Sequence, residues 1–322
     1  MTEYVQTRDY YLDTIKGLLV VGIVLIHTAF HSGTSYVPNY IRNIVLTFDV
    51  PLFFFITGCV TAKHHDINPL KQMYKLILLF FFCVLIYQIC CFKLNIQELM
   101  QPVFLTGAPT SLLYSINASY WFVPMYIVSL IYAKVIISYF KNFVIYSILI
   151  LVPVFYIFMY NIECVEKALG QNVQSFLFYL WLILFGFKMY KFKGRKYWRT
   201  PLILASIAII LLYLYFPNLI MQEYKFPVKL PYFVLSIISI SGMMLIYKDV
   251  KNNFFAKIGK NALYYYLSQG IGASIIFSIA KLPVSIWQVK FFLCFLINLT
   301  ITLFFGYIIS LIYPKLEKLF IK

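Results

Sequence analysis

Lys16 and His27 begin and end the stretch KGLLVVGIVLIH, in which the intervening residues are apolar or glycine. Eleven helical positions rotate by about 1,100°, or three turns plus about 20°, so both side chains share one face. Their separation along the helix axis is about 16 Å. Ionisable groups at membrane depth are costly and usually face an interior cavity. This pair is therefore the first candidate for chemistry, with His27 as a general base.

Asp49 is the candidate partner of His27. If the N-terminus is cytoplasmic, the first span runs outward and the second returns, which places Asp49 near the depth of His27. A carboxylate there could hold one imidazole nitrogen and leave the other basic toward a substrate hydroxyl. Asp49 also precedes Pro51, a good sequence for a helix start. The two roles are compatible.

Two further groups on the first span have alternative interpretations. Lys16 either belongs to the site or is a boundary lysine that Asp13 stabilises one turn earlier. His31 follows His27 by one turn and is expected at the outer boundary or in contact with substrate. No further His or Cys lies at a suitable depth, so no metal site is predicted.

Polar residues elsewhere in the apolar spans mark other candidate walls of a cavity. Asn261, Tyr265 and Gln269 recur every four residues and predict one polar stripe, either for hydrogen bonds between helices or for lining a cavity. Trp121 is expected at the outer start of a span, where it belongs either to an aromatic belt or to one wall of the same cavity. The segment KMYKFKGRKYWR carries six cations that suit either a polyphosphate or anionic lipids. Its candidates for phosphate contact are Lys191, Lys193, Arg195, Lys196 and Arg199.

These residues must be positioned by membrane helices. The 322 residues are 62% hydrophobic and 12% charged, whereas a soluble domain carries about 25% charged residues. Apolar runs long enough to cross a bilayer recur along the chain and predict an all-α bundle with ten spans. The expected spans are 14–32, 43–62, 73–92, 119–140, 143–160, 173–190, 200–216, 231–247, 262–280 and 289–313.

The distribution of positive charge predicts the orientation. With the N-terminus inside, about 20 of the 27 basic residues fall on the cytoplasmic side, as the positive-inside rule requires, and both termini are cytoplasmic. The outer side keeps Arg42, Lys93, Lys167, Lys225, Lys229, Lys281 and Lys290. Cationic inner loops explain the net charge of +16 without a nucleic-acid partner.

No segment resembles a separate soluble domain, so residues 1–322 are expected to form one integral membrane domain. The longest polar connection, 93–118, predicts a re-entrant or interfacial cover over a cavity on the outer side. Neither an internal repeat nor an inverted pair of broken helices is present, which disfavours the common secondary-transporter architectures.

Four motifs, in this order, resemble the acyltransferase 3 family of integral membrane acyltransferases, and most of all its bacterial polysaccharide and sugar O-acetyltransferases. YLDTIKGLLVVGIVLIHT matches the family's basic residue–ten residues–histidine motif, with Lys16 and His27 in the motif positions. FDVPLFFFITGC resembles its FF-x-x-S/T-G segment, YWFVPMY its tryptophan–phenylalanine motif, and IGKNALYYYLSQ its late GxxSLxxYLxH motif. In three places the chain departs from the pattern: Asp49 and Gln269 stand where histidine is frequent, and Ala262 stands where serine is frequent.

The resemblance implies transfer of an acetyl group from cytoplasmic acetyl-CoA to a hydroxyl of a lipid-linked or cell-surface glycan. His27 would act as general base, oriented by Asp49, or would carry the acyl group transiently. Lys16 would stabilise developing negative charge or steer the donor. Arg42, Trp121 and the 93–118 segment would border an outward opening for the sugar.

Acetyl-CoA is expected as a substrate, with no bound cofactor. The expected partners are the glycan acceptor, membrane lipids and polysaccharide-synthesis machinery, and the expected location is the cytoplasmic membrane, crossed many times. Two other functions remain open: an exporter or flippase for glycans or lipids, and a non-catalytic subunit of a polysaccharide-synthesis complex.

Overall fold

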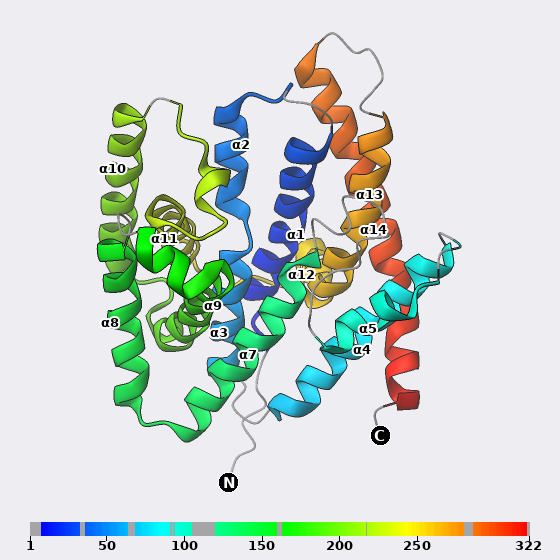
Figure 1. The fold of residues 1–322 in the computed structure, drawn as a ribbon, viewed down its shortest axis with the longest axis horizontal. Helices are drawn as coiled ribbons and strands as arrows, with labels where there is room; N and C mark the ends of the chain where they lie inside the picture. The colour runs from blue at the N-terminus through cyan, green and yellow to red at the C-terminus, as the bar shows by residue number, and fades with distance from the viewer. Residues whose placement is uncertain are drawn as a thin grey trace.

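The computed structural model describes residues 8–32, 36–63, 68–90, 92, 94–104, 120–159, 163–216, 218–279 and 286–320. Within these ranges every regular element is a helix, and no strand occurs (Figure 1). The helices are α1 (Tyr10–His31), α2 (Asn39–Val45), η1 (Leu46–Phe48), α3 (Pro51–Lys63), α4 (Pro69–Cys90), α5 (Ile96–Phe104), α7 (Phe122–Tyr139), α8 (Asn142–Met159), α9 (Glu163–Met189), η2 (Tyr190–Phe192), η3 (Lys196–Trp198), α10 (Arg199–Tyr215), η4 (Met221–Tyr224), α11 (Leu230–Leu245), α12 (Phe254–Lys260), α13 (Ala262–Ile279) and α14 (Trp287–Phe320).

The helices confirm an all-α membrane protein. Seven stretches in the described part of the chain are long and apolar enough to cross a bilayer. They run through α1, α2–η1–α3, α4, α7, the second part of α9, η3–α10 and α14. The other three expected spans correspond to α8, α11 and α13, the first two of which are shorter apolar helices. Each of the ten expected spans therefore corresponds to a helix in the structure.

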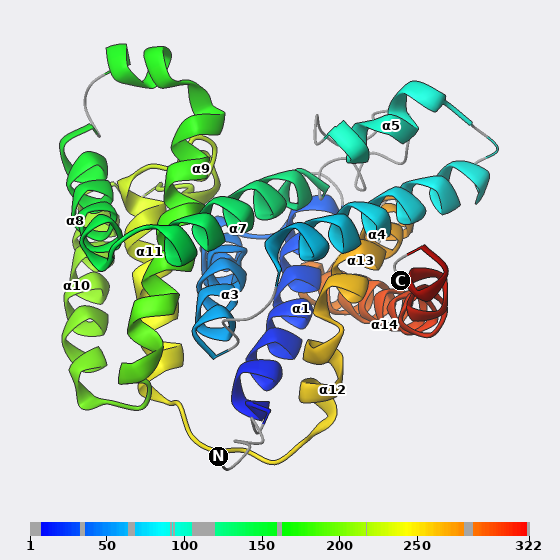
Figure 2. The ribbon, with the colours of Figure 1, turned by 90° about the horizontal axis from the view of Figure 1, so that it is seen from below.

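Helix α1 runs through the middle of the bundle and is flanked by α3 on one side and by α12 and α13 on the other (Figure 2). It meets α12 backbone to backbone, because a Cβ atom on Gly17 would strike the carbonyl of Phe255, and one on Gly259 would strike the carbonyl of Asp13. Only glycine permits so close an approach. This contact fixes the N-terminal half of α1, including Lys16, against α12.

The remaining helices form two groups around α1 (Figure 1). Helices α8, α9, α10 and α11 lie on one side together with α3, and α4, α13 and α14 lie on the other. Aromatic rings fill the first group, as in the stack of Phe54 on Tyr179, whose centroids are 4.2 Å apart. Of the expected 93–118 cover, residues 96–104 form α5, whereas 93 and 105–118 lie outside the described residues.

Candidate active site

His27 is buried on α1 against Gln269 of α13, with 9% and 1% of their surfaces exposed. The Nε2 atoms of the two side chains lie 3.3 Å apart. Nδ1 of His27 and Oε1 of Gln269 are also buried, and neither has a hydrogen-bond partner among the described residues. Buried polar atoms are almost always paired, so an unpaired imidazole nitrogen at this depth is a candidate for contact with a substrate.

His31 stacks on His27, with ring centroids 5.1 Å apart and planes 15° apart. The two imidazoles follow one another along α1, as the one-turn spacing predicts. Among the described residues, no group of three His, Cys, Asp or Glu side chains could hold a metal ion. Because the two rings stack, His31 extends the imidazole surface of His27 toward the end of α1.

Asp49 does not form the expected hydrogen bond with His27. Its carboxylate is 2% exposed and forms an ion pair with Lys225, with Oδ2 2.6 Å from Nζ. The hydroxyl of Tyr232 donates to the same oxygen at 2.6 Å, and the Val50 N–H donates to Oδ1 at 2.7 Å. Helix α3 begins at Pro51, as the sequence predicted, but the Asp49 carboxylate bonds the Val50 N–H, which precedes the helix, so its capping role stays a prediction. The pairing prediction was wrong because the loop between α10 and α11 supplies a buried cation that satisfies the carboxylate.

Lys225 connects Asp49 to Trp121. Its side chain is buried, with 5% of the residue exposed. Its ammonium lies 5.5 Å from the centre of the Trp121 ring, and that ring meets Phe226 edge-on at 4.6 Å. Trp121 therefore packs against the loop that supplies the partner of Asp49, and its place in the wall of a substrate cavity stays a prediction.

Arg42 lies on α2 beside the end of α1. Its guanidinium carbon is 5.5 Å from the centre of the Phe30 ring, and its buried Nε has no hydrogen-bond partner among the described residues. Phe30 immediately precedes His31. Arg42 is thus near the C-terminal end of the histidine-bearing helix.

The predicted stripe of Asn261, Tyr265 and Gln269 does not form a single surface. Asn261 ends α12, and α13 begins only at Ala262. Tyr265 packs in an apolar cluster with Val20, against the position of Gly306 on α14. The four-residue spacing failed because the helix breaks at Asn261 and because α14 covers Tyr265, so only Gln269 reaches His27.

Lys16 lies about three helical turns before His27 on α1 and lines a cavity of about 240 Å³. Its ammonium pairs with Oδ1 of Asp13 at 2.6 Å, which confirms the contact that the boundary interpretation expected. Lys134 of α7 and Lys260 of α12 line the same cavity, together with Thr57, Thr61, Gln72, Tyr126 and mostly apolar residues. None of the lining residues in the described part of the chain is acidic. The cavity therefore favours an anionic occupant.

Aromatic side chains form one part of the wall of this cavity. Phe53, Phe122 and Tyr266 line it, and the rings of Phe122 and Tyr266 lie 4.7 Å apart. Tyr266 precedes Gln269 by three residues on α13, or about one turn. The aromatic part of the wall thus includes a residue one turn before Gln269 on α13.

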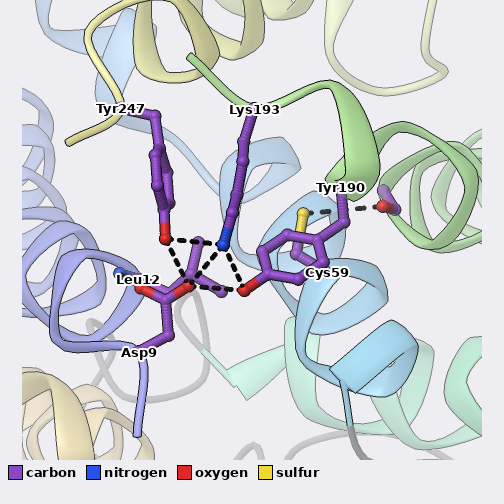
Figure 3. A network of polar contacts seen from close by, with 7 residues as sticks. Asp9, Leu12, Cys59, Tyr190, Lys193 and Tyr247 are labelled. Atoms are coloured by element: carbon purple, nitrogen blue, oxygen red, sulfur yellow. Dashed lines mark hydrogen bonds and ion pairs between the residues drawn. The ribbon is translucent and has the colours of Figure 1, made fainter. Parts of the chain in front are cut away.

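The basic candidates 191–199 lie elsewhere, and none of the five lines the cavity. Lys193 donates to the hydroxyls of Tyr190 and Tyr247 at 2.8 and 2.7 Å, and both hydroxyls donate to Asp9, which caps α1 (Figure 3). Burial raises the pKa of Asp9, but the hydrogen bonds from Tyr190 and Tyr247 outweigh it and hold this pKa below its usual value. The other four side chains are exposed: Lys191, Arg195, Lys196 and Arg199.

Comparison with known families decides the class. The model of the acyltransferase 3 family, an acyltransferase domain, matches residues 9–312. The chain belongs to the acyltransferase 3 family. No curated protein and no solved structure matches the chain significantly. Membership makes the protein a membrane acyltransferase, and the matched region contains both motif residues, Lys16 and His27.

Sequence patterns did not predict the surroundings of three lysines in this acyltransferase. Lys225 stood among seven outer cations, and nothing in its local sequence indicates burial. Lys134 did carry a signal, because it interrupts the apolar run of α7 (IYAKVIISY), where a lone cation usually faces an interior. Lys260 follows Gly259, and its position depends on the contact between α12 and α1.

Proposed function

We propose that this acyltransferase moves an acetyl group from cytoplasmic acetyl-CoA to a hydroxyl of a lipid-linked or cell-surface glycan. The observation that carries the proposal is the arrangement of two candidate sites along α1. Lys16 contributes to a cation-lined cavity, and His27, on the same helix face, presents a buried nitrogen without a partner among the described residues. The glycan acceptor follows from the motifs that resemble sugar O-acetyltransferases.

The lysine-lined cavity is the proposed donor site. Coenzyme A carries a diphosphate and a ribose phosphate, and ammonium groups are suitable partners for such charges. Lys16, Lys134 and Lys260 approach the cavity from three different helices, so they could bind phosphates without a continuous basic segment. The exposed 191–199 segment is then a region where the donor first meets the protein.

In the proposed chemistry His27 acts as general base. The amide orientation of glutamine is interchangeable, and rotation brings Oε1 of Gln269 to accept from Nε2–H of His27. Nδ1 is then basic and takes the proton of the acceptor hydroxyl as the oxygen attacks the thioester carbonyl. The carbon–sulfur bond breaks, and the departing thiolate takes the proton back from the imidazolium. In the alternative route His27 itself attacks, carries the acetyl group and passes it to the hydroxyl.

Lys225 would support this step. Its buried ammonium would stabilise the oxyanion that forms when the thioester is attacked. Asp49 holds Lys225 in position and so contributes to the site through it.

The acceptor is proposed to enter beside Trp121 and Phe226. Phe226 is 41% exposed and meets the half-buried Trp121 edge-on, which leaves aromatic surface beside Lys225. Aromatic rings bury the apolar faces of other molecules efficiently while leaving polar edges hydrated. His31 and Arg42 would offer hydrogen bonds at the same opening.

The test is acetyl transfer by the purified protein in lipid bilayers, with labelled acetyl-CoA and isolated surface glycan. We expect His27→Ala to abolish transfer while the protein remains monodisperse and folded. Lys134→Gln is expected to raise KM for acetyl-CoA roughly tenfold, because a charge-assisted contact is lost. Lys141→Gln, an exposed change away from the cavity, is the matched control and should leave both constants unchanged.

Two results would overturn the proposal. Acetyl transfer that survives in His27→Ala would remove the assigned base. Glycan export that is lost in cells without any change in the acetyl content of the surface glycan, measured by mass spectrometry, would favour the exporter. The same spectra would identify the acyl group and the acetylated position.

A further inference from the structure

A second cavity lies away from the active site, in a groove of about 420 Å³ between α4, α13 and α14. Its walls are apolar and include Phe82 and Ile86 of α4, Ile271 of α13, and Phe305 and Ile309 of α14. All three helices belong to the expected spans. The groove, called here the α4–α14 groove, is therefore at membrane depth.

The polar atoms in the walls of the α4–α14 groove are already used. The Tyr87 hydroxyl donates to the Leu267 carbonyl at 3.0 Å, and the Tyr313 hydroxyl donates to the Lys75 carbonyl at 2.7 Å. The described lining then has only the weakly polar thiol of Cys83 to offer. Water would gain few hydrogen bonds in such a groove, whereas hydrocarbon would lose none.

The α4–α14 groove opens toward the surroundings of the bundle. Only 33% of the α4 span and 22% of the α14 span are buried. Several wall residues are substantially exposed, with Ile86 at 46%, Phe305 at 36% and Ile312 at 48%. At one end the two helices are joined by the ion pair of Lys75 with Glu317 and by the hydrogen bond of Tyr313. An acyl chain could therefore enter from the bilayer without crossing the protein.

The joined end carries a polar recess of about 230 Å³, which shares Leu79 and Tyr313 with the groove. Lys75, Lys260 and Glu317 line this recess. Exposed lysines surround it on the beginning of α4, the end of α12 and the end of α14: Lys71, Lys257, Lys315 and Lys318. The described residues of these helix ends thus carry six lysines against Glu317, an excess that suits an anionic head group.

We propose that the α4–α14 groove holds one acyl chain of an anionic phospholipid, with its phosphate in the lysine-bearing recess. The apolar walls account for the chain, the lateral opening for its entry, and the excess of lysines for the choice of an anionic over a zwitterionic head group. By the positive-inside rule the lipid comes from the cytoplasmic leaflet. The groove shares no lining residue with the proposed donor cavity, whereas the recess shares Lys260 with it.

Native mass spectrometry of the full chain, released from bilayers of equal phosphatidylglycerol and phosphatidylcholine, tests the proposal. We expect the wild type to retain phosphatidylglycerol preferentially. Ile309→Trp fills the groove and should reduce retention about tenfold, since each displaced methylene group weakens binding severalfold. Lys75→Gln leaves Glu317 beside the phosphate and should remove the preference for the anionic lipid. Leu211→Trp, on the exposed face of α10, is the matched control and should change neither.

Other occupants would give different results. Equal retention of both lipids by the wild type, or unchanged retention in Ile309→Trp, would overturn the proposal. A dimer that Ile309→Trp dissociates would show that a second copy covers the groove. A tightly held free fatty acid would show that the phosphate contacts are wrong. Thermal melting of each variant confirms that it is folded.

Discussion

At the scale of single residues, the imidazole of His27 is held by a neutral neighbour, Gln269, and not by a carboxylate. We predict that Gln269→Ala lowers kcat roughly 10- to 100-fold, because a buried hydrogen bond that orients the base is lost. KM for acetyl-CoA should stay near its wild-type value, since Gln269 does not line the donor cavity. Steady-state rates with varied acetyl-CoA separate the two constants.

The conservative variant Gln269→His restores the residue that is frequent in the family's late motif and can still bond His27. It should therefore retain more activity than Gln269→Ala. Equal losses in both variants, or a kcat for the alanine variant within twofold of wild type, would contradict the positioning role.

The buried pair of Asp49 and Lys225 is expected to show strong energetic coupling. Lys225→Met leaves a 2% exposed carboxylate without its cation, which should destabilise the fold by about 3–5 kcal/mol. The double variant Asp49→Asn with Lys225→Met removes both charges and should recover most of that stability. Denaturation in detergent, followed by a double-mutant cycle, measures the coupling.

Activity then distinguishes a structural pair from a catalytic one. If the charge of Lys225 supports the reaction, the double variant stays slow in kcat even though it is stable. Wild-type kcat in the stable double variant would limit the pair to holding the α10–α11 loop.

The sequence identified His27 and Lys16 because helical geometry and the cost of buried charge act within a single span. It could not identify the partner of Asp49, because depth does not determine which face of a helix meets its neighbour. Lys225 arrives from a loop more than 170 positions away, and no local pattern marks its burial. Long-range pairs of this kind follow from packing alone.

At the scale of helices, the contact between α1 and α12 positions the donor cavity. We predict that Gly259→Ala destabilises the protein by about 1–3 kcal/mol, because the new Cβ would strike the Asp13 carbonyl and force the helices apart. KM for acetyl-CoA should rise as well, since Lys16 and Lys260 flank this contact. Melting temperature and steady-state rates provide the two readouts.

Gly242→Ala on α11 is the matched control. A Cβ at Gly242 would meet nothing within 4 Å, so the same change should be neutral or slightly stabilising. If Gly242→Ala and Gly259→Ala destabilised the protein equally, helix propensity and not the close approach would be the cause.

The predicted stripe of Asn261, Tyr265 and Gln269 shows why the exact ends of helices are harder to predict than the positions of membrane spans. The four-residue spacing correctly indicated that Gln269 faces inward, but it assumed one continuous helix from Asn261 onward. The chain instead ends α12 with Asn261, whose N–H bonds to the Ile258 carbonyl, and restarts at Ala262. A one-residue break changes which neighbours each side chain meets, and hydropathy contains no information about it.

At the scale of the whole molecule, the fold followed from composition because a bilayer requires every buried backbone group to bond within its own helix. Hydropathy therefore located the helices well. The same physics does not specify which helices become neighbours, and the cavity between α1, α7 and α12 depends on that arrangement. Sequence patterns therefore favour the continuous basic segment 191–199 as a phosphate site, whereas the three lysines that line the cavity are far apart in the sequence.

Orientation in the membrane is the remaining property of the whole molecule, and charge predicts it. The two ends of the described chain, α1 and α14, lie toward the same edge of the bundle (Figure 1). With cytoplasmic termini, the α7–α8 connection faces inward and the α10–α11 loop faces outward. Single cysteines at the exposed positions Lys141 and Glu223, in a background without the native cysteines, report these locations.

We expect a membrane-impermeant thiol reagent to label Glu223→Cys in intact cells and Lys141→Cys only after permeabilisation. The reverse pattern would show that the protein has the opposite orientation in the membrane. The lysine-lined cavity would then face away from cytoplasmic acetyl-CoA, and the proposed donor would be wrong whichever residues are catalytic. Labelling of both positions in intact cells would instead contradict the number of spans between them. The outcome thus connects the direction of acyl transfer to the distribution of lysines along the chain.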